Sequence, residues 1–203
     1  RDLSVVSNLP KLKNLVANDN KISTLSHLKN AKSLDSVEVN NNNIDRLDFE
    51  NNTITSLEIK NNKLDNINNI HKLTSLENLD ASDNEISELP TNKHNKLVNL
   101  TLSNNKITTL ENVNNLTALK YLTIPNNYVS TLVLKEKNKI LEYLDISHNN
   151  ISKEELTVPS GEKIPKGIAD NFEKVDGGDV KDNYTLSTDY ITNEAKKLQE
   201  EIL

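Results

Sequence analysis

The stretch "LVNLTLSNNKITTL", residues 97–110, contains the pattern that decides the fold. Its residues follow the skeleton L-x-x-L-x-L-x-x-N-x-I-x-x-L, which fits neither an amphipathic helix nor an alternating strand along its whole length. Asn105 occupies a position inside this apolar pattern. The skeleton occurs seven times, with asparagines 20 to 22 residues apart: Asn20, Asn42, Asn62, Asn84, Asn105, Asn127 and Asn149. The chain is therefore predicted to be a repeat array.

Each repeat predicts one coil of a stacked structure. The two apolar residues before the asparagine indicate a short strand with both side chains directed inward, and stacking pairs these strands in parallel at about 4.8 Å per coil. We expect seven strands, at residues 14–18, 36–40, 56–60, 78–82, 99–103, 121–125 and 143–147. A carboxamide has two donors and an acceptor, so the asparagines are predicted to form a structural ladder that satisfies backbone groups left without a strand partner at the turn.

The arcs that return the chain to the next strand alternate between two types. Regular arcs place apolar residues three apart, as in segments 3–12, 25–34, 67–76 and 110–119. The arcs "LDFENNTI" (47–54), "LPTNKHNKL" (89–97) and "LVLKEKNKIL" (132–141) lack this step. A step of three suits one or two turns of 3₁₀ helix, so we expect little regular α-helix.

This skeleton resembles the leucine-rich repeat, and more narrowly the internalin-like repeats of Gram-positive bacterial surface proteins. The segments "HKLTSLENLDASDNEI" (71–86) and "NNLTALKYLTIPNN" (114–127) show the resemblance best. It covers roughly residues 1–152 and implies an α/β solenoid, a leucine-rich repeat horseshoe with a parallel β-sheet on its concave face and 3₁₀ or irregular arcs on its convex face. It also implies a non-enzymatic protein-binding module of a larger, extracellular cell-wall protein that acts in adhesion, host-protein interaction or virulence.

The pattern divides the chain into two parts. Residues 1–156 form the predicted array of seven repeats, whose first coil is entered partway at Arg1. Residues 157–203 are expected to be a C-terminal cap or connector, because all four glycines lie between Gly161 and Gly178. The segment "STDYITNEAKKLQEEIL" (187–203) predicts a terminal helix. A chain without methionine that starts at Arg1 suggests a piece of a longer protein.

Several function classes are disfavoured by composition. The chain has no cysteine, which excludes disulfides, thiolate metal sites and a cysteine nucleophile. A net charge of −6 argues against nucleic-acid binding, and no apolar run approaches the ~20 residues of a membrane span. The four histidines occupy different points of the coil and indicate no metal column. We therefore expect no catalytic residue, no cofactor and no metal.

The concave face offers the candidate protein-binding residues: Glu38, Glu58, Asp80, Thr101, Tyr121, Thr123, Tyr143 and Asp145. Like charges side by side cost about 0.2–1 kcal/mol per pair, so the acidic row suggests either a solvated face or a surface for a partner with a basic patch. Tyr121 and Tyr143 are predicted neighbours that serve as binding anchors or support a C-terminal cap. Two other functions fit the sequence: a rigid spacer between adhesive or haem-binding domains, and an intracellular leucine-rich adaptor, which shares the 22-residue period.

Overall fold

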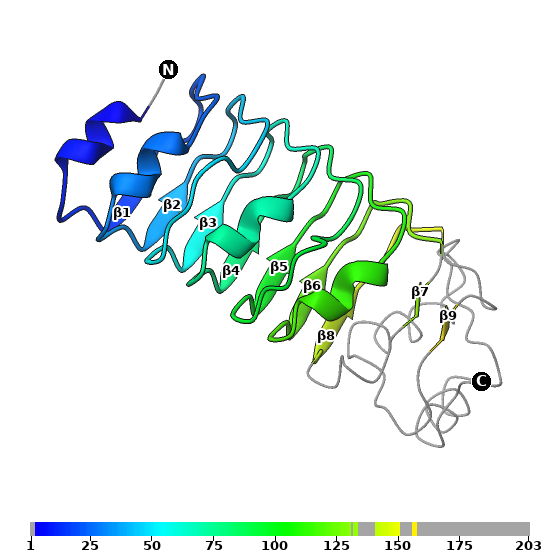
Figure 1. Ribbon diagram of the computed structural model, residues 1–203. Coiled ribbons are helices and arrows are strands. Elements are labelled where there is room, and N and C mark those ends of the chain that lie inside the picture. The colour runs from blue at the N-terminus through cyan, green and yellow to red at the C-terminus, as the bar shows by residue number, and fades with distance from the viewer. Residues whose placement is uncertain (1–2, 131, 134–140, 151–155, 158–203) are drawn as a thin grey trace.

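Seven three-residue strands lie side by side along the array in the computed structural model, which describes residues 3–130, 132–133, 141–150 and 156–157 (Figure 1). The sheet order is β1-β2-β3-β4-β5-β6-β8, and every neighbouring pair is parallel. The strands are β1 (Asn14–Val16), β2 (Ser36–Glu38), β3 (Ser56–Glu58), β4 (Asn78–Asp80), β5 (Asn99–Thr101), β6 (Tyr121–Thr123) and β8 (Tyr143–Asp145). This arrangement confirms the predicted parallel solenoid. The terminal helix and nearly all of the cap predicted for residues 157–203 lie outside the described residues.

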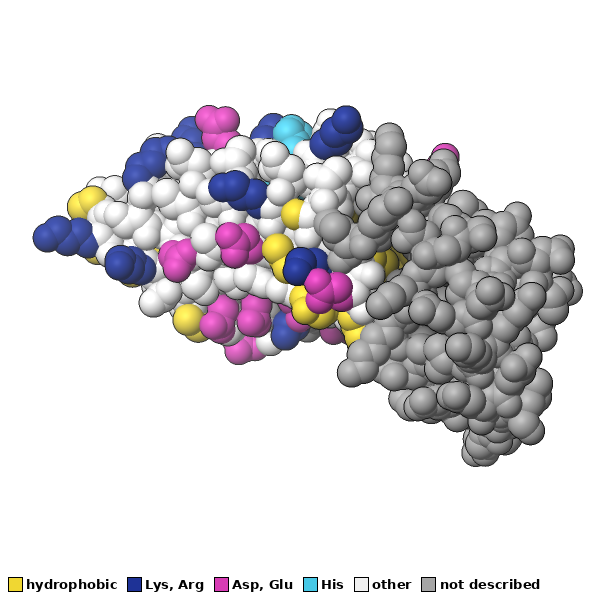
Figure 2. Space-filling model, turned by 90° about the horizontal axis from the view of Figure 1, so that it is seen from below, with side chains coloured by type: hydrophobic (Ala, Val, Ile, Leu, Met, Phe, Trp, Pro, Cys, Tyr) yellow, Lys and Arg dark blue, Asp and Glu magenta, His cyan; other side chains and the backbone are white. Residues whose placement is uncertain are grey.

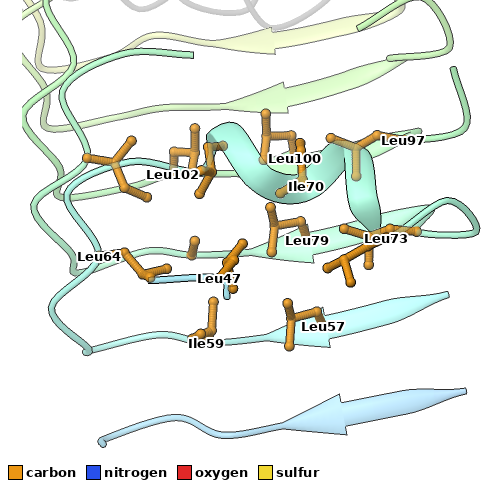
Figure 3. Packing of buried hydrophobic residues seen from close by; sticks show 14 of the residues in the cluster. Leu47, Leu57, Ile59, Leu64, Ile70, Leu73, Leu79, Leu97, Leu100 and Leu102 are labelled. Atoms are coloured by element: carbon orange, nitrogen blue, oxygen red, sulfur yellow. The ribbon is translucent and has the colours of Figure 1, made fainter. Parts of the chain in front are cut away.

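The central residue of each strand points into the core. Parallel pairing places Leu57, Leu79 and Leu100 in register, and each is at most 2% exposed. Figure 3 shows these leucines stacked in successive coils, with Ile70 and Leu73 of a regular arc packed across from them. Because each coil contributes only part of the core, burial of its apolar side chains depends on the neighbouring coils.

The strands are shorter than the predicted five residues because asparagine side chains replace backbone partners after the third residue. Two further backbone bonds join the coils, from Ala17 N–H to Glu38 O at 2.8 Å and from Asp19 N–H to Asn40 O at 2.9 Å. The carbonyl oxygen of Ala17 then accepts the Asn42 side chain at 3.0 Å. The N–H of Asn40 donates instead to Asn18 Oδ1, at 2.7 Å. Side-chain amides thus end the strand without leaving these backbone groups unpaired.

The predicted asparagine ladder is present, as Asn62 illustrates. Its Nδ2 donates to the carbonyl oxygens of Val39, Ile59 and Lys60 at 3.0–3.1 Å, and its Oδ1 accepts the N–H of Ile44 at 3.0 Å. One side chain therefore bonds both its own coil and the preceding coil. The same set of four bonds is made by Asn42, Asn84, Asn105, Asn127 and Asn149, all of which are buried.

Asn20 differs from the other six ladder residues. It is exposed, and its Nδ2 bonds only within its own coil, to Ala17 O at 3.3 Å and Asn18 O at 2.8 Å. Among the described residues, no preceding strand coil lies against it. Asn20 therefore lacks the bonds between coils that the buried ladder asparagines make.

The residue before each ladder asparagine has a left-handed backbone conformation. Its φ lies between 49° and 58° in all seven coils, at Asp19, Asn41, Asn61, Asp83, Asn104, Asn126 and His148. Asn, Asp and His are the non-glycine residues enriched in this region. Some of these side chains also bond along the array, as in Asn61 Nδ2 to Asn41 Oδ1 at 2.8 Å. The turn of each coil is therefore encoded without glycine.

The regular arcs contain the predicted 3₁₀ helices: η1 (Ser4–Asn8), η2 (Ser26–Asn30), η3 (Asn68–Lys72) and η4 (Glu111–Asn115). The two irregular arcs at 47–54 and 89–97 instead pair with the following regular arc through bridges at Asn51 and His94. A separate parallel pair joins β7 (Leu132–Val133) to β9 (Leu156–Thr157). From η2 onward the two kinds of arc alternate along the described array, as predicted, whereas η1 and η2 lie in consecutive coils and depart from the alternation.

Candidate protein-interaction surface

The outward side chains of the seven strands form one continuous surface, which we call the sheet face; it corresponds to the face predicted to be concave. All eight residues predicted from the sequence lie on it. Register pairs Glu38 with Glu58, and Glu58 with Asp80, in one row. Thr101, Thr123 and Asp145 continue this row, and Tyr121 lies beside Tyr143 in the adjacent row. The predicted neighbour relations on this surface are therefore present.

The acidic row is compensated by donors from the neighbouring row. Asn18 Nδ2 donates to Glu38 Oε2 at 3.4 Å, and Asn40 Nδ2 donates to Glu58 Oε2 at 3.2 Å. These amides provide favourable partners for two carboxylates that the strand pairing places side by side. The like-charge repulsion expected from the sequence is therefore offset within the array itself.

Lys60 performs the same role for the third carboxylate. Its Nζ lies 3.2 Å from Asp80 Oδ2 and 3.6 Å from Glu58 Oε2. The hydrogen bond to Asp80 and the nearby negative charges raise the pKa of Lys60. The other oxygen of Asp80 accepts the N–H and the hydroxyl of Ser82, at 3.1 and 2.7 Å. Asp80 is thus engaged through both oxygens, whereas Glu38 and Glu58 are bonded through one oxygen each.

Asp145, at the other end of the row, makes the same two bonds to a following serine as Asp80 does. Its Oδ1 accepts the N–H of Ser147 at 3.0 Å and the hydroxyl at 2.7 Å. An aspartate followed two residues later by serine therefore holds the turn after the strand in both coils. Asp80 and Asp145 have local structural roles that the sequence pattern alone does not reveal.

The tyrosine end of the sheet face contains a charged pair. The hydroxyl of Tyr121 donates to Glu142 Oε2 at 3.0 Å, and Lys120 Nζ lies 2.8 Å from Glu142 Oε1. The bond to the Glu142 carboxylate raises the pKa of the Tyr121 phenol, while the bond from Lys120 is the largest cause that lowers the pKa of Glu142. The Tyr121 ring is held in place although the residue is 41% exposed. The sequence signal for this cluster is that Lys120 and Glu142 each immediately precede a tyrosine.

The rest of the described surface is mostly polar, with Val5, Leu9 and Tyr128 as its exposed large hydrophobic residues. Figure 2 shows charged side chains of both signs scattered among uncharged ones, with few hydrophobic side chains between them. An open hollow of about 450 Å³ lies beside Asn40, Lys60 and Asp83 and has polar walls. No three His, Asp or Glu side chains of the described residues are grouped to hold a metal ion. None of the described helices has the length and apolar character of a membrane span.

Comparison with known proteins identifies the fold. No protein-family model and no curated protein sequence matches the chain. The functional domain of InlJ from Listeria monocytogenes, which includes a cysteine ladder, has a similar structure: the TM-score is 0.54, identity is 22%, and the match covers 74% of this chain and 38% of that one. A leucine-rich repeat protein of Leptospira interrogans matches with a TM-score of 0.50 and 23% identity over 74% of this chain and 52% of that one. The chain thus spans about half or less of the length of these two proteins, and it has the leucine-rich repeat fold predicted from the sequence.

Proposed function

We propose that this leucine-rich repeat solenoid is a non-enzymatic protein-binding module that uses its sheet face. The observation that carries the proposal is the pair formed by Tyr121 and Tyr143 at one end of a mainly polar surface, opposite the exposed Val16 of β1. Tyrosine is enriched among residues that dominate the energetics of protein interfaces, because it combines a large apolar ring with a polar tip. The bond between Tyr121 and Glu142 orients one of these rings before any partner arrives.

The framework beneath the sheet face favours binding because it is well ordered internally. Every buried side-chain nitrogen or oxygen of the described residues has a hydrogen-bond partner. The central leucines of β3, β4, β5, β6 and β8 are almost completely buried. A rigid platform loses little conformational entropy on association, so a few anchor residues suffice for affinity.

The carboxylates with remaining acceptor capacity indicate the charge of the partner. Glu38 and Glu58 lie side by side and are bonded through one oxygen each, by neutral amides and, for Glu58, also by Lys60. A basic patch would be attracted to this end of the sheet face. Such charges accelerate association more than they strengthen the final complex, and salt screens their effect.

We further propose that the module belongs to a larger internalin-like protein on a bacterial surface and contacts a host or surface protein. The residue pattern of the repeats and the structural similarity to the InlJ domain support this setting. A spacer role requires the same stiffness but makes no use of oriented tyrosines. Detection of a protein partner would therefore distinguish a binding module from a spacer.

The test is a binding measurement with matched tyrosine variants. Proteins captured by the immobilised array are identified, and the affinity of each is measured for the wild type and for the double variant Tyr121→Ala/Tyr143→Ala. Loss of both rings should weaken binding by about 2 kcal/mol or more. Tyr128→Ala is the control, because Tyr128 is 58% exposed but follows the turn, away from the strands of the sheet face.

Two results would contradict this assignment. A folded double variant that binds as tightly as the wild type would show that the two tyrosines are not binding anchors. A double variant that loses its circular dichroism spectrum or its cooperative unfolding shows that the rings support a C-terminal cap instead. Failure of the array to retain any protein, with its fold intact, favours the spacer.

A further inference from the structure

Each of the two described irregular arcs buries one polar side chain against apolar neighbours. Asn51 is 3% exposed and His94 is 5% exposed. Each lies three residues before a buried aliphatic residue, Ile54 or Leu97. The two positions are therefore equivalent in the array, although one side chain is an amide and the other a titratable ring.

The backbone at both positions pairs with the following coil in the same way. Asn51 N–H donates to Lys72 O, and Thr74 N–H donates to Asn51 O, both at 3.2 Å. The corresponding bonds of His94 are made with Asn115 O at 2.9 Å and Thr117 N–H at 3.1 Å. Each arc is thus fixed to the regular arc that follows it.

The side chain of Asn51 connects its arc to the preceding coil. Its Nδ2 donates to Leu28 O at 3.0 Å and to Ala31 O at 3.3 Å. Its Oδ1 accepts the N–H groups of Thr53 and Ile54, at 2.8 and 3.0 Å. The amide therefore both joins two coils and closes the turn at the end of its own arc.

The ring of His94 makes equivalent contacts. Its Nε2 lies 3.0 Å from Leu73 O, on the preceding regular arc. Its Nδ1 lies 3.0 Å from the N–H of Leu97 and 3.3 Å from that of Lys96. A backbone N–H can only donate, so Nδ1 is the acceptor and the proton of the neutral ring is on Nε2.

Protonation would break the two bonds to Nδ1 that close the turn, while Nε2–H still donates to Leu73 O. A proton on Nδ1 would face two N–H donors and leave both without an acceptor. Burial lowers the pKa of His94, and the positive charges of His71 and Lys96 lower it further, against the bond to Leu73, which raises it. The charged or titratable groups on the elements that pack here are His71 and Lys72 in η3, Lys93 and Lys96 in the same arc, and Glu111 in the first turn of η4.

We propose that His94 makes the arc between β4 and β5 an acid-sensitive joint of the solenoid. When the ring takes up a proton, the turn amides of Lys96 and Leu97 lose their acceptor, so the turn at the end of the arc opens and exposes the charged ring to solvent. The arc at Asn51 has no titratable group in this position and stays closed. The proposal concerns the scaffold and does not rest on the binding function.

The direction of the effect follows from proton linkage. The open arc exposes a histidine that titrates near 6.5, whereas the closed arc holds the ring neutral to lower pH. The open state therefore binds more protons, and acid favours it. The stabilisation of the closed arc by the neutral His94 ring is complete above pH 6.5 and is lost as the pH falls below this value. At pH 5 the opening equilibrium can rise by up to about 30-fold from this one group.

The experiment compares the pH dependence of the wild type with that of His94→Asn, a replacement that introduces the side chain found natively at the equivalent Asn51. Amide hydrogen exchange of Leu97 and Thr117, and urea unfolding, are measured at pH 7.5 and pH 5.0. The wild type should lose protection at these amides by up to about 30-fold more than the variant over this interval. His27→Asn, which changes a half-buried histidine of η2, should keep the wild-type pH dependence.

Parallel pH profiles for the wild type and a folded His94→Asn variant would overturn the proposal. If His94→Asn does not fold, the ring is titrated by NMR in the wild type. A His94 ring that titrates below 6.5 together with loss of Leu97 protection supports the acid-sensitive joint. A ring that titrates at its ordinary pKa, or one that titrates while Leu97 stays protected, refutes it.

Discussion

The substitution Asn105→Ala tests the asparagine ladder most directly. The side chain is 5% exposed and donates to the carbonyl oxygens of Ala81, Leu102 and Ser103 at 3.0–3.2 Å. Its Oδ1 accepts the N–H of Ile86 at 3.0 Å. Removal of the amide therefore takes one hydrogen bond from each of three acceptors and from one donor. The free-energy cost differs between these groups.

The three carbonyl oxygens keep a second donor each. These donors are the side chains of Asn84 and Asn127 and the N–H of Asp83. The buried N–H of Ile86 has only the Asn105 oxygen, so it is the group left unpaired. An unsatisfied buried donor costs about 1–3 kcal/mol, and this is the destabilisation we expect.

The assay is urea unfolding followed by circular dichroism, with Asn20→Ala as the matched control. Asn20 is the ladder residue that is exposed and bonds only within its own coil, so its loss should change the free energy of unfolding by less than about 0.5 kcal/mol. Hydrogen exchange at Ile86 should also accelerate in Asn105→Ala. Equal unfolding midpoints for the two variants would refute the account of the ladder.

Three other variants probe the core and the sheet face. Leu100→Ala should lower the free energy of unfolding by about 2–5 kcal/mol because it opens a cavity at a fully buried position; urea melts measure this. Glu142→Gln should lower the pKa of the Tyr121 phenol toward its ordinary value, because it replaces the carboxylate that holds the proton; an alkaline NMR titration measures the change. Replacement of Glu38 and Glu58 by Gln should slow association with a basic partner and reduce its salt dependence, with little change in dissociation, as stopped-flow kinetics would show.

The strands and the ladder could be predicted because each is specified by side-chain types that recur in every coil. An inward apolar residue such as Leu100, followed five residues later by an amide such as Asn105, needs no knowledge of the neighbouring coils. Strand length could not be predicted in the same way. It depends on which donor reaches the Ala17 carbonyl, and the Asn42 side chain reaches it instead of a backbone N–H.

The compensation of the acidic row could not be predicted, for a related reason. The register of Glu38 and Glu58 is visible in the sequence, but the direction of the Asn18, Asn40 and Lys60 side chains is not. The choice of Tyr121 and Tyr143 as anchors remains a prediction.

The structurally important residues of the irregular arcs could not be identified from the sequence. His94 stands out in the sequence only as a potential metal ligand, and Asn51 lies in an asparagine-rich run without apolar periodicity. The sequence signal shared by His94 and Asn51 is a polar residue three positions before the aliphatic residue that ends the arc. Only the structure shows that these polar side chains are buried.

The bridges at Asn51 and His94 restrict how such an array can change in length. Both of the described irregular arcs bond a regular arc on each side, through the Asn51 or His94 side chain to the coil before and through the backbone to the coil after. Two regular arcs can be neighbours, as η1 and η2 are, but two irregular arcs placed side by side would leave these groups without partners. Recombination between repeats in the gene should therefore preserve the protein only when every irregular arc keeps a regular arc on both sides, and a designer who lengthens the solenoid can meet this condition by adding the double unit of one irregular and one regular coil.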